Sequence, residues 1–344
     1  MNDRAILTRD YLRCPLCQRD GRWLYRDLTD RLFSVPGQWN IRQCSDAACG
    51  LHWLDPQPLE TDIAQAYQSY FTHQTDTNMK QRTQKYIKDD CLALHYGYHV
   101  KSIGLAQHAA GLFAYLAPFH QGGADTRARL LSSLPRGRTL DVGCGDGQLV
   151  EFIQGLGWRA EGVDFDRVAV EIAKSKGLTV SVGMLREQHH PDDSFDTIIL
   201  SHFIEHVHDF AALLLECRRI LRTGGRILIL TPNADSWAHR KFGSAWFALD
   251  PPRHLHIFTN QSLRALVERS GLKVHSATIS LRNLGTIITG SCAIRDTGRF
   301  NSNRPKSLLQ RYEVGCLQIR EWLAWQHASA NGEELTFIVE KTGV

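Results

Sequence analysis

The sequence lacks several features that would place it in a specialised class of protein. Its 344 residues carry a formal net charge of only +4, with basic and acidic residues well mixed, so it offers no concentrated basic patch for nucleic acid. The longest apolar stretch, 111–119, is far too short to span a bilayer of about 30 Å. The first residues show no apolar segment followed by a small-residue cleavage site, so we expect no secretory signal and a cytoplasmic location.

Nothing in the composition indicates a disulfide-stabilised, disordered or fibrous protein. Nine cysteines are an odd number, and a cytoplasmic chain keeps its thiols reduced. With 43% hydrophobic and 22% charged residues, the chain is typical of a globular protein. Its length exceeds the roughly 100–200 residues of one average domain, so we expect one large domain with additions, or two domains.

Four of the cysteines are clustered near the N-terminus. Cys14 and Cys17 form a C-x2-C pair, and Cys44 and Cys49 form a looser C-x4-C pair. Two such pairs are typical of a four-thiolate zinc site, which is structural because no position is left open for a substrate. His52 could replace Cys49 as a ligand. A redox C-x-x-C pair is the main alternative, but such a pair belongs at a helix N-terminus. The simplest alternative is that these cysteines are buried and unreactive.

The organisation changes twice along the chain. Residues 1–57 combine the cysteine pairs with aromatic-rich short strands, and 58–135 are mostly compatible with helix, including Tyr67, Tyr70 and Phe71 as a possible lid. From 136 to 344, apolar strands alternate with amphipathic helices, which predicts a doubly wound α/β domain. We expect a helical insertion at about 283–330, followed by one last strand.

A glycine-rich loop is the strongest chemical signal. The segment LDVGCGDG, residues 140–147, follows a predicted strand and opens a predicted helix, where glycines let the backbone approach a ligand. Asp164 ends the next strand, 23 residues after Asp141, and is placed to bind the ribose of an adenosine-containing ligand. A nicotinamide dinucleotide is one alternative. The carboxylates of this segment favour S-adenosylmethionine, which carries a sulfonium and an amino group in place of two phosphates.

Four segments together resemble the class I S-adenosylmethionine-dependent methyltransferases. These are LDVGCGDG, GVDFD, HPDDSFDTIILSHFIEHVHD and LRTGGRILILTPN. The resemblance covers about residues 136–280 plus the last strand, and it implies a seven-stranded sheet whose last strand is antiparallel. It also implies that the loop faces the methionine part of the cofactor, that Asp164 binds the ribose and that Met184 and Leu185 border the adenine. The predicted cofactor site comprises Asp141, Gly143, Cys144, Gly145, Asp164, Phe165, Met184, Leu185 and Ser201.

The N-terminal segment indicates a smaller group within this family. CPLC, CGLHWLDPQP and DPPRHLHIFT are together similar to bacterial methyltransferases with a zinc-binding N-terminus, several of which act on sugars or secondary-metabolite intermediates. Zinc-containing sugar C-methyltransferases share the first two parts but carry a further C-terminal domain. This chain has only an insertion and one strand there.

Candidate catalytic residues lie in two segments after the predicted fourth and fifth strands, where parallel strands end and ligands bind. His202, Glu205 and His206 form the first set and could exchange the acceptor's proton; equally, Glu205 and His206 could only brace the next helix. The second set is a rigid two-proline loop, in which we expect His254 to line the acceptor pocket and His256 to brace the loop. Two histidines alone are weak evidence of a metal.

The leading hypothesis is therefore a methyltransferase for a small molecule, using S-adenosylmethionine and a structural zinc. An RNA methyltransferase is the second hypothesis, because some ribosomal RNA enzymes also begin with a cysteine zinc site, although the weak charge excess argues against it. A third is a cofactor-binding assembly partner without catalysis. The sequence does not identify the acceptor, the atom methylated or the oligomeric state.

Overall fold

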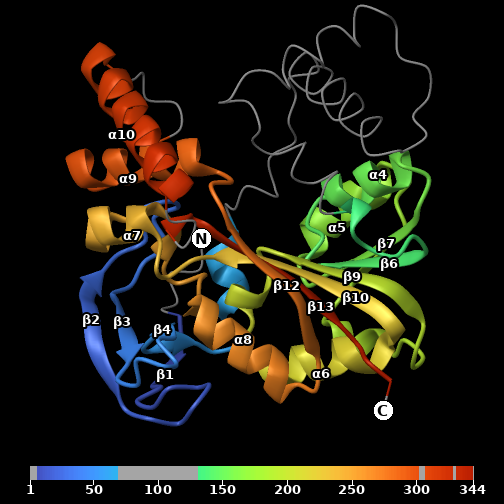
Figure 1. Ribbon diagram of the computed structural model, residues 1–344. Coiled ribbons are helices and arrows are strands. Elements are labelled where there is room, and N and C mark those ends of the chain that lie inside the picture. The colour runs from blue at the N-terminus through green and yellow to red at the C-terminus, as the bar shows by residue number, and fades with distance from the viewer. Residues whose placement is uncertain (1–5, 69–130, 302–306, 328–330, 344) are drawn as a thin grey trace, which may run out of the picture. The chain divides into compact units, whose positions relative to one another are not determined.

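The computed structural model describes residues 6–68, 131–301, 307–327 and 331–343 (Figure 1). The chain divides into two compact units. The first unit comprises residues 1–70, 201–215 and 229–339, and the second comprises 71–200, 216–228 and 340–344. Most of the predicted connector over 58–135 lies outside the described residues, as do Tyr70 and Phe71 of the possible lid. The predicted domain boundaries at 57 and 135 stay a prediction.

A mixed seven-stranded sheet confirms the predicted doubly wound α/β class. Its strand order is β12-β13-β10-β9-β6-β7-β8, and β6 pairs in parallel with both β7 and β9. The inner strand β9 is apolar and mostly buried, as expected where helices cover a parallel sheet. Their bounds are β6 Arg138–Val142, β7 Arg159–Asp164, β8 Val180–Val182, β9 Phe195–Ser201, β10 Leu221–Pro232, β12 Lys273–Ser280 and β13 Glu334–Glu340.

The last strand runs antiparallel to β10, as the resemblance implied. The Lys341 amide donates to the Gly225 carbonyl, while the Asn233 amide donates to the Glu333 carbonyl. The partner's residue number thus falls as the position along β10 rises, which is the register of an antiparallel pair.

The helices follow the predicted alternation, and several begin at a capping side chain. Asp166 accepts hydrogen bonds from two amides at the start of α5, and Thr259 caps α8. The apolar pattern from Phe210 to Leu221 also predicts a helix that ends at Gly224-Gly225. This detail is wrong, because α6 ends at Ile220 and both glycines lie within β10. The bounds are α4 Gln148–Gly155, α5 Arg167–Ser175, α6 Phe210–Ile220, α7 Trp237–Phe242, α8 Asn260–Arg269, α9 Leu284–Thr297 and α10 Leu308–His327, with 3-10 turns η1 Ile63–Tyr67, η3 Leu185–Gln188, η4 Ile204–His206, η5 Gly243–Ala245 and η6 Phe247–Leu249.

A second sheet is built from segments that are distant in the sequence. Three N-terminal strands, β2 Gly21–Leu28, β3 Trp39–Cys44 and β4 His52–Leu54, are joined by β11, His256–Ile257, in the order β11-β4-β3-β2. The pairing of β11 with β4 is antiparallel, with His256 opposite Trp53. A short two-stranded sheet pairs β1, Thr8–Arg9, with β5, Gln57–Pro58. The N-terminal segment therefore lies in the first unit.

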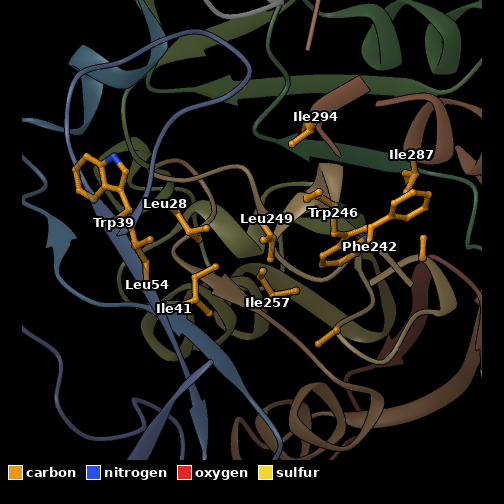
Figure 2. Packing of buried hydrophobic residues seen from close by; sticks show 14 of the residues in the cluster. Leu28, Trp39, Ile41, Leu54, Phe242, Trp246, Leu249, Ile257, Ile287 and Ile294 are labelled. Carbon is orange, nitrogen blue, oxygen red and sulfur yellow. The ribbon is translucent and has the colours of Figure 1, made fainter. Parts of the chain in front are cut away.

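A hydrophobic core joins that sheet to the helices of the first unit. Figure 2 shows Leu28, Ile41 and Leu54 from the sheet beside Leu249 and Ile257. Trp39 and Trp246 are almost completely buried in the same cluster. Burying a large aromatic or aliphatic side chain contributes roughly 1.5–3 kcal/mol, so this cluster is a major source of stability for the segment 250–258 that carries the polar site. Among the described residues, no helix is both long and apolar enough to cross a membrane.

Two buried glutamates make a testable contribution to stability. Glu321 in α10 and Glu333 before β13 are 0% and 1% exposed. Burial, reinforced by the charge of Glu333, raises the pKa of Glu321 to about 10. The pKa of Glu321 in the folded protein lies above its ordinary value of 4.5. The contribution of Glu321 to the free energy of unfolding is therefore complete below pH 4.5 and is lost as the pH rises toward 10.

We expect Glu321→Gln to stabilise the protein at pH 8 by more than about 1 kcal/mol, because the amide removes the cost of a buried carboxylate. Urea unfolding at pH 5 and pH 8 measures this gain in the free energy of unfolding, and Glu268→Gln, which changes an exposed glutamate, is the control. An unchanged dependence of stability on pH in Glu321→Gln would contradict this role of Glu321.

Candidate functional site

The glycine loop lies between β6 and α4 in the second unit, in the strand–loop–helix context that the sequence predicted. Gly143 and Gly145 have φ angles of +79° and +53°, a left-handed region that glycine adopts without strain. The amide of Gly143 donates to the Val163 carbonyl of the neighbouring strand at 2.8 Å. The backbone of this loop can thus approach a ligand without a side chain in the way.

Asp164 ends β7 and connects that strand to the loop. Its two carboxylate oxygens accept hydrogen bonds from the amides of Gly145 and Asp166, both at 2.8 Å. The side chain is 8% exposed, and burial raises the pKa of Asp164. Each carboxylate oxygen has a second lone pair, so Asp164 can still accept from ribose hydroxyls.

The other predicted cofactor residues differ in exposure. Cys144 is buried, and Gly162 has no side chain where the Cys144 sulfur packs, so only the backbone of Cys144 is suited to a ligand. Met184 is 43% exposed, whereas Leu185 is 5% exposed. Asp141 is buried, and Phe165 and Ser201 are half-buried. Their contacts with a cofactor stay a prediction.

The four N-terminal cysteines come together in the first unit. Their sulfur atoms all lie within 4.8 Å of one another; Cys14 and Cys49 are 3.7 Å apart, and Cys17 and Cys44 are 3.4 Å apart. Sulfurs bound 2.3 Å from a tetrahedral zinc would be roughly 3.8 Å apart, so the spacing fits that ion. Two tight turns hold the pairs, one closed by the Gln18 amide on the Cys14 carbonyl and one by Gly50 on Asp46.

The alternatives for these cysteines fit less well. The four-sulfur group contains Cys49, and His52 is not among its members. No helix begins at Cys14 or Cys17, where the chain forms a turn, so the helix-terminal setting of a redox pair is missing. All eight described cysteines are free thiols.

The candidate catalytic residues gather in the first unit. Glu205 and His206 lie in η4, directly after β9, and His254 lies in the loop before β11. One ligand atom from each of these three residues lies within 4.8 Å of the others. His256 is separate: it is completely buried in β11, with its Nε2 3.2 Å from the Gln57 amide nitrogen.

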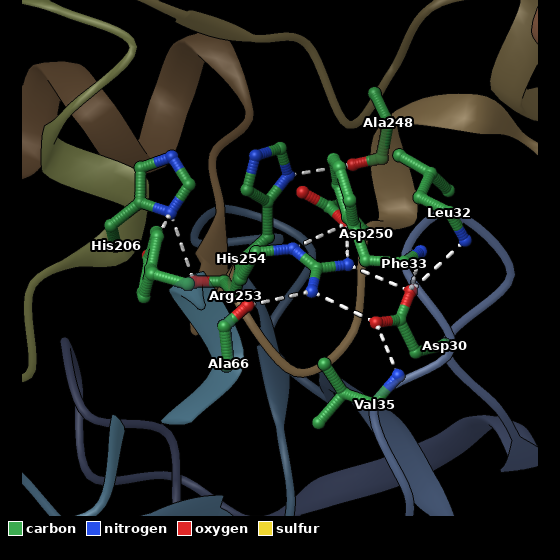
Figure 3. Close-up of polar contacts among 11 residues, drawn as sticks. Asp30, Leu32, Phe33, Val35, Ala66, His206, Ala248, Asp250, Arg253 and His254 are labelled. Carbon is green, nitrogen blue, oxygen red and sulfur yellow. Dashed lines mark hydrogen bonds and ion pairs between the residues drawn. The ribbon is translucent and has the colours of Figure 1, made fainter. Parts of the chain in front are cut away.

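Hydrogen bonds position the two imidazoles. His206 Nδ1 is 3.0 Å from the Arg253 carbonyl, and His254 Nδ1 is 2.8 Å from the Ala248 carbonyl (Figure 3). A carbonyl oxygen only accepts, so the Nδ1 of His254 donates and its Nε2 keeps a lone pair. His206 Nδ1 also lies 2.9 Å from the Tyr67 hydroxyl, which can donate to it or accept from it. Burial, reinforced by His254, lowers the pKa of His206 to about 3, so this ring is neutral at pH 7.

His202 differs from the other two histidines because carboxylates flank it. Its Nε2 is 2.9 Å from Glu334 and its Nδ1 is 3.4 Å from Glu205. Burial alone would lower its pKa, but the two carboxylates outweigh burial and raise the pKa of His202 to about 9. Burial would likewise raise the pKa of Glu205, but the neighbouring histidines lower it to about 2. At neutral pH, His202 is therefore a cation and Glu205 an anion.

A buried arginine, Arg253, lies beside this cluster. Arg253 is 0% exposed and makes hydrogen bonds to both oxygens of Asp30, at 2.8 and 2.9 Å, and to Asp250 (Figure 3). The carbonyl oxygen of Arg253 lies 3.0 Å from His206 Nδ1. Sequence reasoning missed Asp30 and Arg253, because their positions are 223 residues apart and no local pattern joins them.

Comparison with known proteins identifies the α/β part of the chain. Residues 114–277 match the family model described as a methyltransferase domain. Together with the strand order of the seven-stranded sheet, this match shows a methyltransferase domain with the Rossmann-like class I fold.

The curated relatives that match this part of the chain are also methyltransferases. A probable S-adenosylmethionine-dependent methyltransferase of Mycolicibacterium smegmatis is 36% identical over 137 residues, 39% of this chain and 51% of that protein. A ubiquinone biosynthesis O-methyltransferase of Thiobacillus denitrificans is 28% identical over 168 residues, 45% of this chain and 70% of that protein. The chain thus spans only about half the length of the first of these.

Solved structures are similar to this chain at a lower sequence identity. An S-adenosylmethionine-dependent methyltransferase from Archaeoglobus fulgidus aligns with a TM-score of 0.42 and 20% identity, over 63% of this chain and 92% of that one. The assignment of the methyltransferase domain therefore depends on the family model, the curated relatives and the strand order.

Proposed function

We propose that this protein transfers the methyl group of S-adenosylmethionine to a small molecule, such as a sugar, a polysaccharide precursor or a secondary-metabolite intermediate. The observation that carries the proposal is the glycine loop with Asp164 hydrogen-bonded across its base, within a methyltransferase domain. The Thiobacillus relative, a ubiquinone biosynthesis O-methyltransferase, supports a small-molecule acceptor.

Two groups would be held by different parts of the chain. The backbone of Gly143 and Gly145, with Asp164, would hold S-adenosylmethionine, which supplies a methyl group activated by a sulfonium. Cys14, Cys17, Cys44 and Cys49 would hold one zinc ion, which supplies structural stability because its four positions are filled by protein.

The polar cluster of the first unit is proposed to act on the acceptor. His202 is positively charged and suits an anionic or hydroxyl group of the acceptor. His254 presents an Nε2 lone pair, His206 lies beside it, and Glu205 presents a carboxylate oxygen, Oε1, 3.4 Å from His202 Nδ1. Transfer of a methyl group to a hydroxyl or amine requires that a proton leaves the acceptor, and these groups are proposed to receive it.

Replacement of Asp164 by alanine tests the cofactor site. We expect the dissociation constant for S-adenosylmethionine to rise roughly 10–100-fold, since hydrogen bonds to a charged group contribute about 1.5–3 kcal/mol. Isothermal titration calorimetry on zinc-replete protein measures the constant, and Asp192→Ala, an exposed aspartate, is the matched control.

The same titration tests the proposed activity as a whole. If the unmodified chain bound neither S-adenosylmethionine nor S-adenosylhomocysteine, the proposal would be wrong. If it bound both but methylated no acceptor, it would act as a cofactor-binding assembly partner instead. Salt-dependent retention of RNA would favour the RNA methyltransferase hypothesis.

A further inference from the structure

We propose that Glu205, His206 and His254 form a binding site for a divalent transition-metal ion, separate from the four-cysteine cluster. The three residues offer one carboxylate oxygen and two imidazole nitrogens, with one ligand atom of each lying within 4.8 Å of the others. This donor set is the one that transition-metal ions such as zinc, cobalt and manganese accept in proteins.

The first argument is that the three residues bring acceptor atoms together around one point. Nδ1 of His254 donates to a backbone carbonyl, so its Nε2 carries a lone pair. Glu205 is 0% exposed, its Oε2 accepts from the Thr231 hydroxyl at 3.0 Å, and its Oε1 makes no hydrogen bond and lies 3.4 Å from His202 Nδ1. Buried polar atoms are nearly always paired, and a cation would pair this oxygen and the two imidazoles at once.

The second argument is the support behind the two imidazoles. Metal-binding histidines almost always donate their second ring nitrogen to a carbonyl or carboxylate, which fixes the tautomer and the ring orientation. His254 does so through Nδ1. His206 Nδ1 lies 3.0 Å from the Arg253 carbonyl and 2.9 Å from the Tyr67 hydroxyl, and Figure 3 shows the two rings side by side. Their ring centroids are 4.7 Å apart, so a small closure would bring both Nε2 atoms onto one ion.

Glu205 brings a carboxylate, which would balance part of the charge of a dication. The neighbouring His202 lies between Glu334, at 2.9 Å, and Glu205, at 3.4 Å. His206 is half-buried, so an ion can reach the site. Three protein ligands leave at least one coordination position open, as in catalytic metal sites.

Cobalt binding tests this site independently of methyl transfer. Protein with its cysteine cluster loaded with zinc is titrated with Co²⁺, and the visible absorption of cobalt bound by nitrogen and oxygen is followed. We expect one Co²⁺ per chain, without the sulfur-to-metal charge-transfer bands that thiolate ligands produce. Glu205→Gln and His254→Ala should each weaken binding at least about tenfold, equivalent to about 1.4 kcal/mol.

Controls separate this result from misfolding and from the proposed activity. His275→Ala, which removes an exposed histidine of β12, should bind Co²⁺ like the parent. Glu205→Gln preserves side-chain size, and circular dichroism with retained zinc shows whether each variant is folded. Absence of a Co²⁺ equivalent beyond the zinc, or unchanged affinity in both folded variants, would overturn the proposal, whether or not the protein binds S-adenosylmethionine.

Discussion

Arg253→Met is expected to destabilise the protein by about 3–5 kcal/mol, the usual cost of removing one partner from a buried ion pair. Arg253 has no exposed surface, and Asp30 and Asp250 are 3% and 5% exposed. Without the guanidinium, two carboxylates would stay buried without a counter-charge. The total stability of a domain is about 5–15 kcal/mol, so the loss is a large part of the whole.

Urea unfolding of the purified variant at neutral pH measures this loss. Lys174→Met is the matched control, because Lys174 forms only an exposed ion pair with Glu171 in α5 and such pairs contribute about 0.2–1 kcal/mol. In the double variant Arg253→Met with Asp30→Asn, one of the uncompensated charges is gone, and part of the stability should return. If Arg253→Met were as stable as the control, the network would not stabilise the fold.

Cys14→Ser is expected to remove one equivalent of zinc and to unfold the N-terminal sheet. Apparent zinc-binding free energies in small cysteine sites are roughly 10–16 kcal/mol, comparable with the stability of a whole domain. Cys14 is 0% exposed and lies 3.7 Å from Cys49, so a hydroxyl there cannot replace the thiolate. Metal analysis and thermal unfolding measure the two effects.

Cys316→Ser is the matched control, because Cys316 is an exposed cysteine of α10 outside the cluster. We expect its zinc content and melting temperature to match the parent. Cys44→Ser should behave like Cys14→Ser. Retention of full metal content and stability by both cluster variants would show that these cysteines do not bind structural zinc.

Local patterns were sufficient for most of the α/β fold. Strand–helix alternation and the glycine loop each involve residues within a few positions, and the structure shows both. The Gly224-Gly225 pair misled because paired glycines usually end a helix, whereas here the extended strand β10 begins three residues earlier, at Leu221.

Contacts between distant segments could not be read from the sequence. The sequence places Glu205 and His206 in one set and His254 in another, and only the fold shows that the three side chains lie together. The pairing of β11 with β4 has the same origin, because a two-residue strand has no periodicity of its own to detect. The protonation of His202 was equally hidden, since Glu334 lies 132 residues away.

The late strand β11 has a consequence for how the chain folds during synthesis. β4 ends at Leu54, but β11 begins only at His256, about 200 residues later. At about 5–20 residues per second on the ribosome, the edge of β4 would wait roughly 10–40 seconds for its partner. Over that interval the nascent N-terminal sheet exposes an unpaired edge, and early zinc binding by the cysteines would be the means of holding it in a productive conformation until residues 256–257 are made.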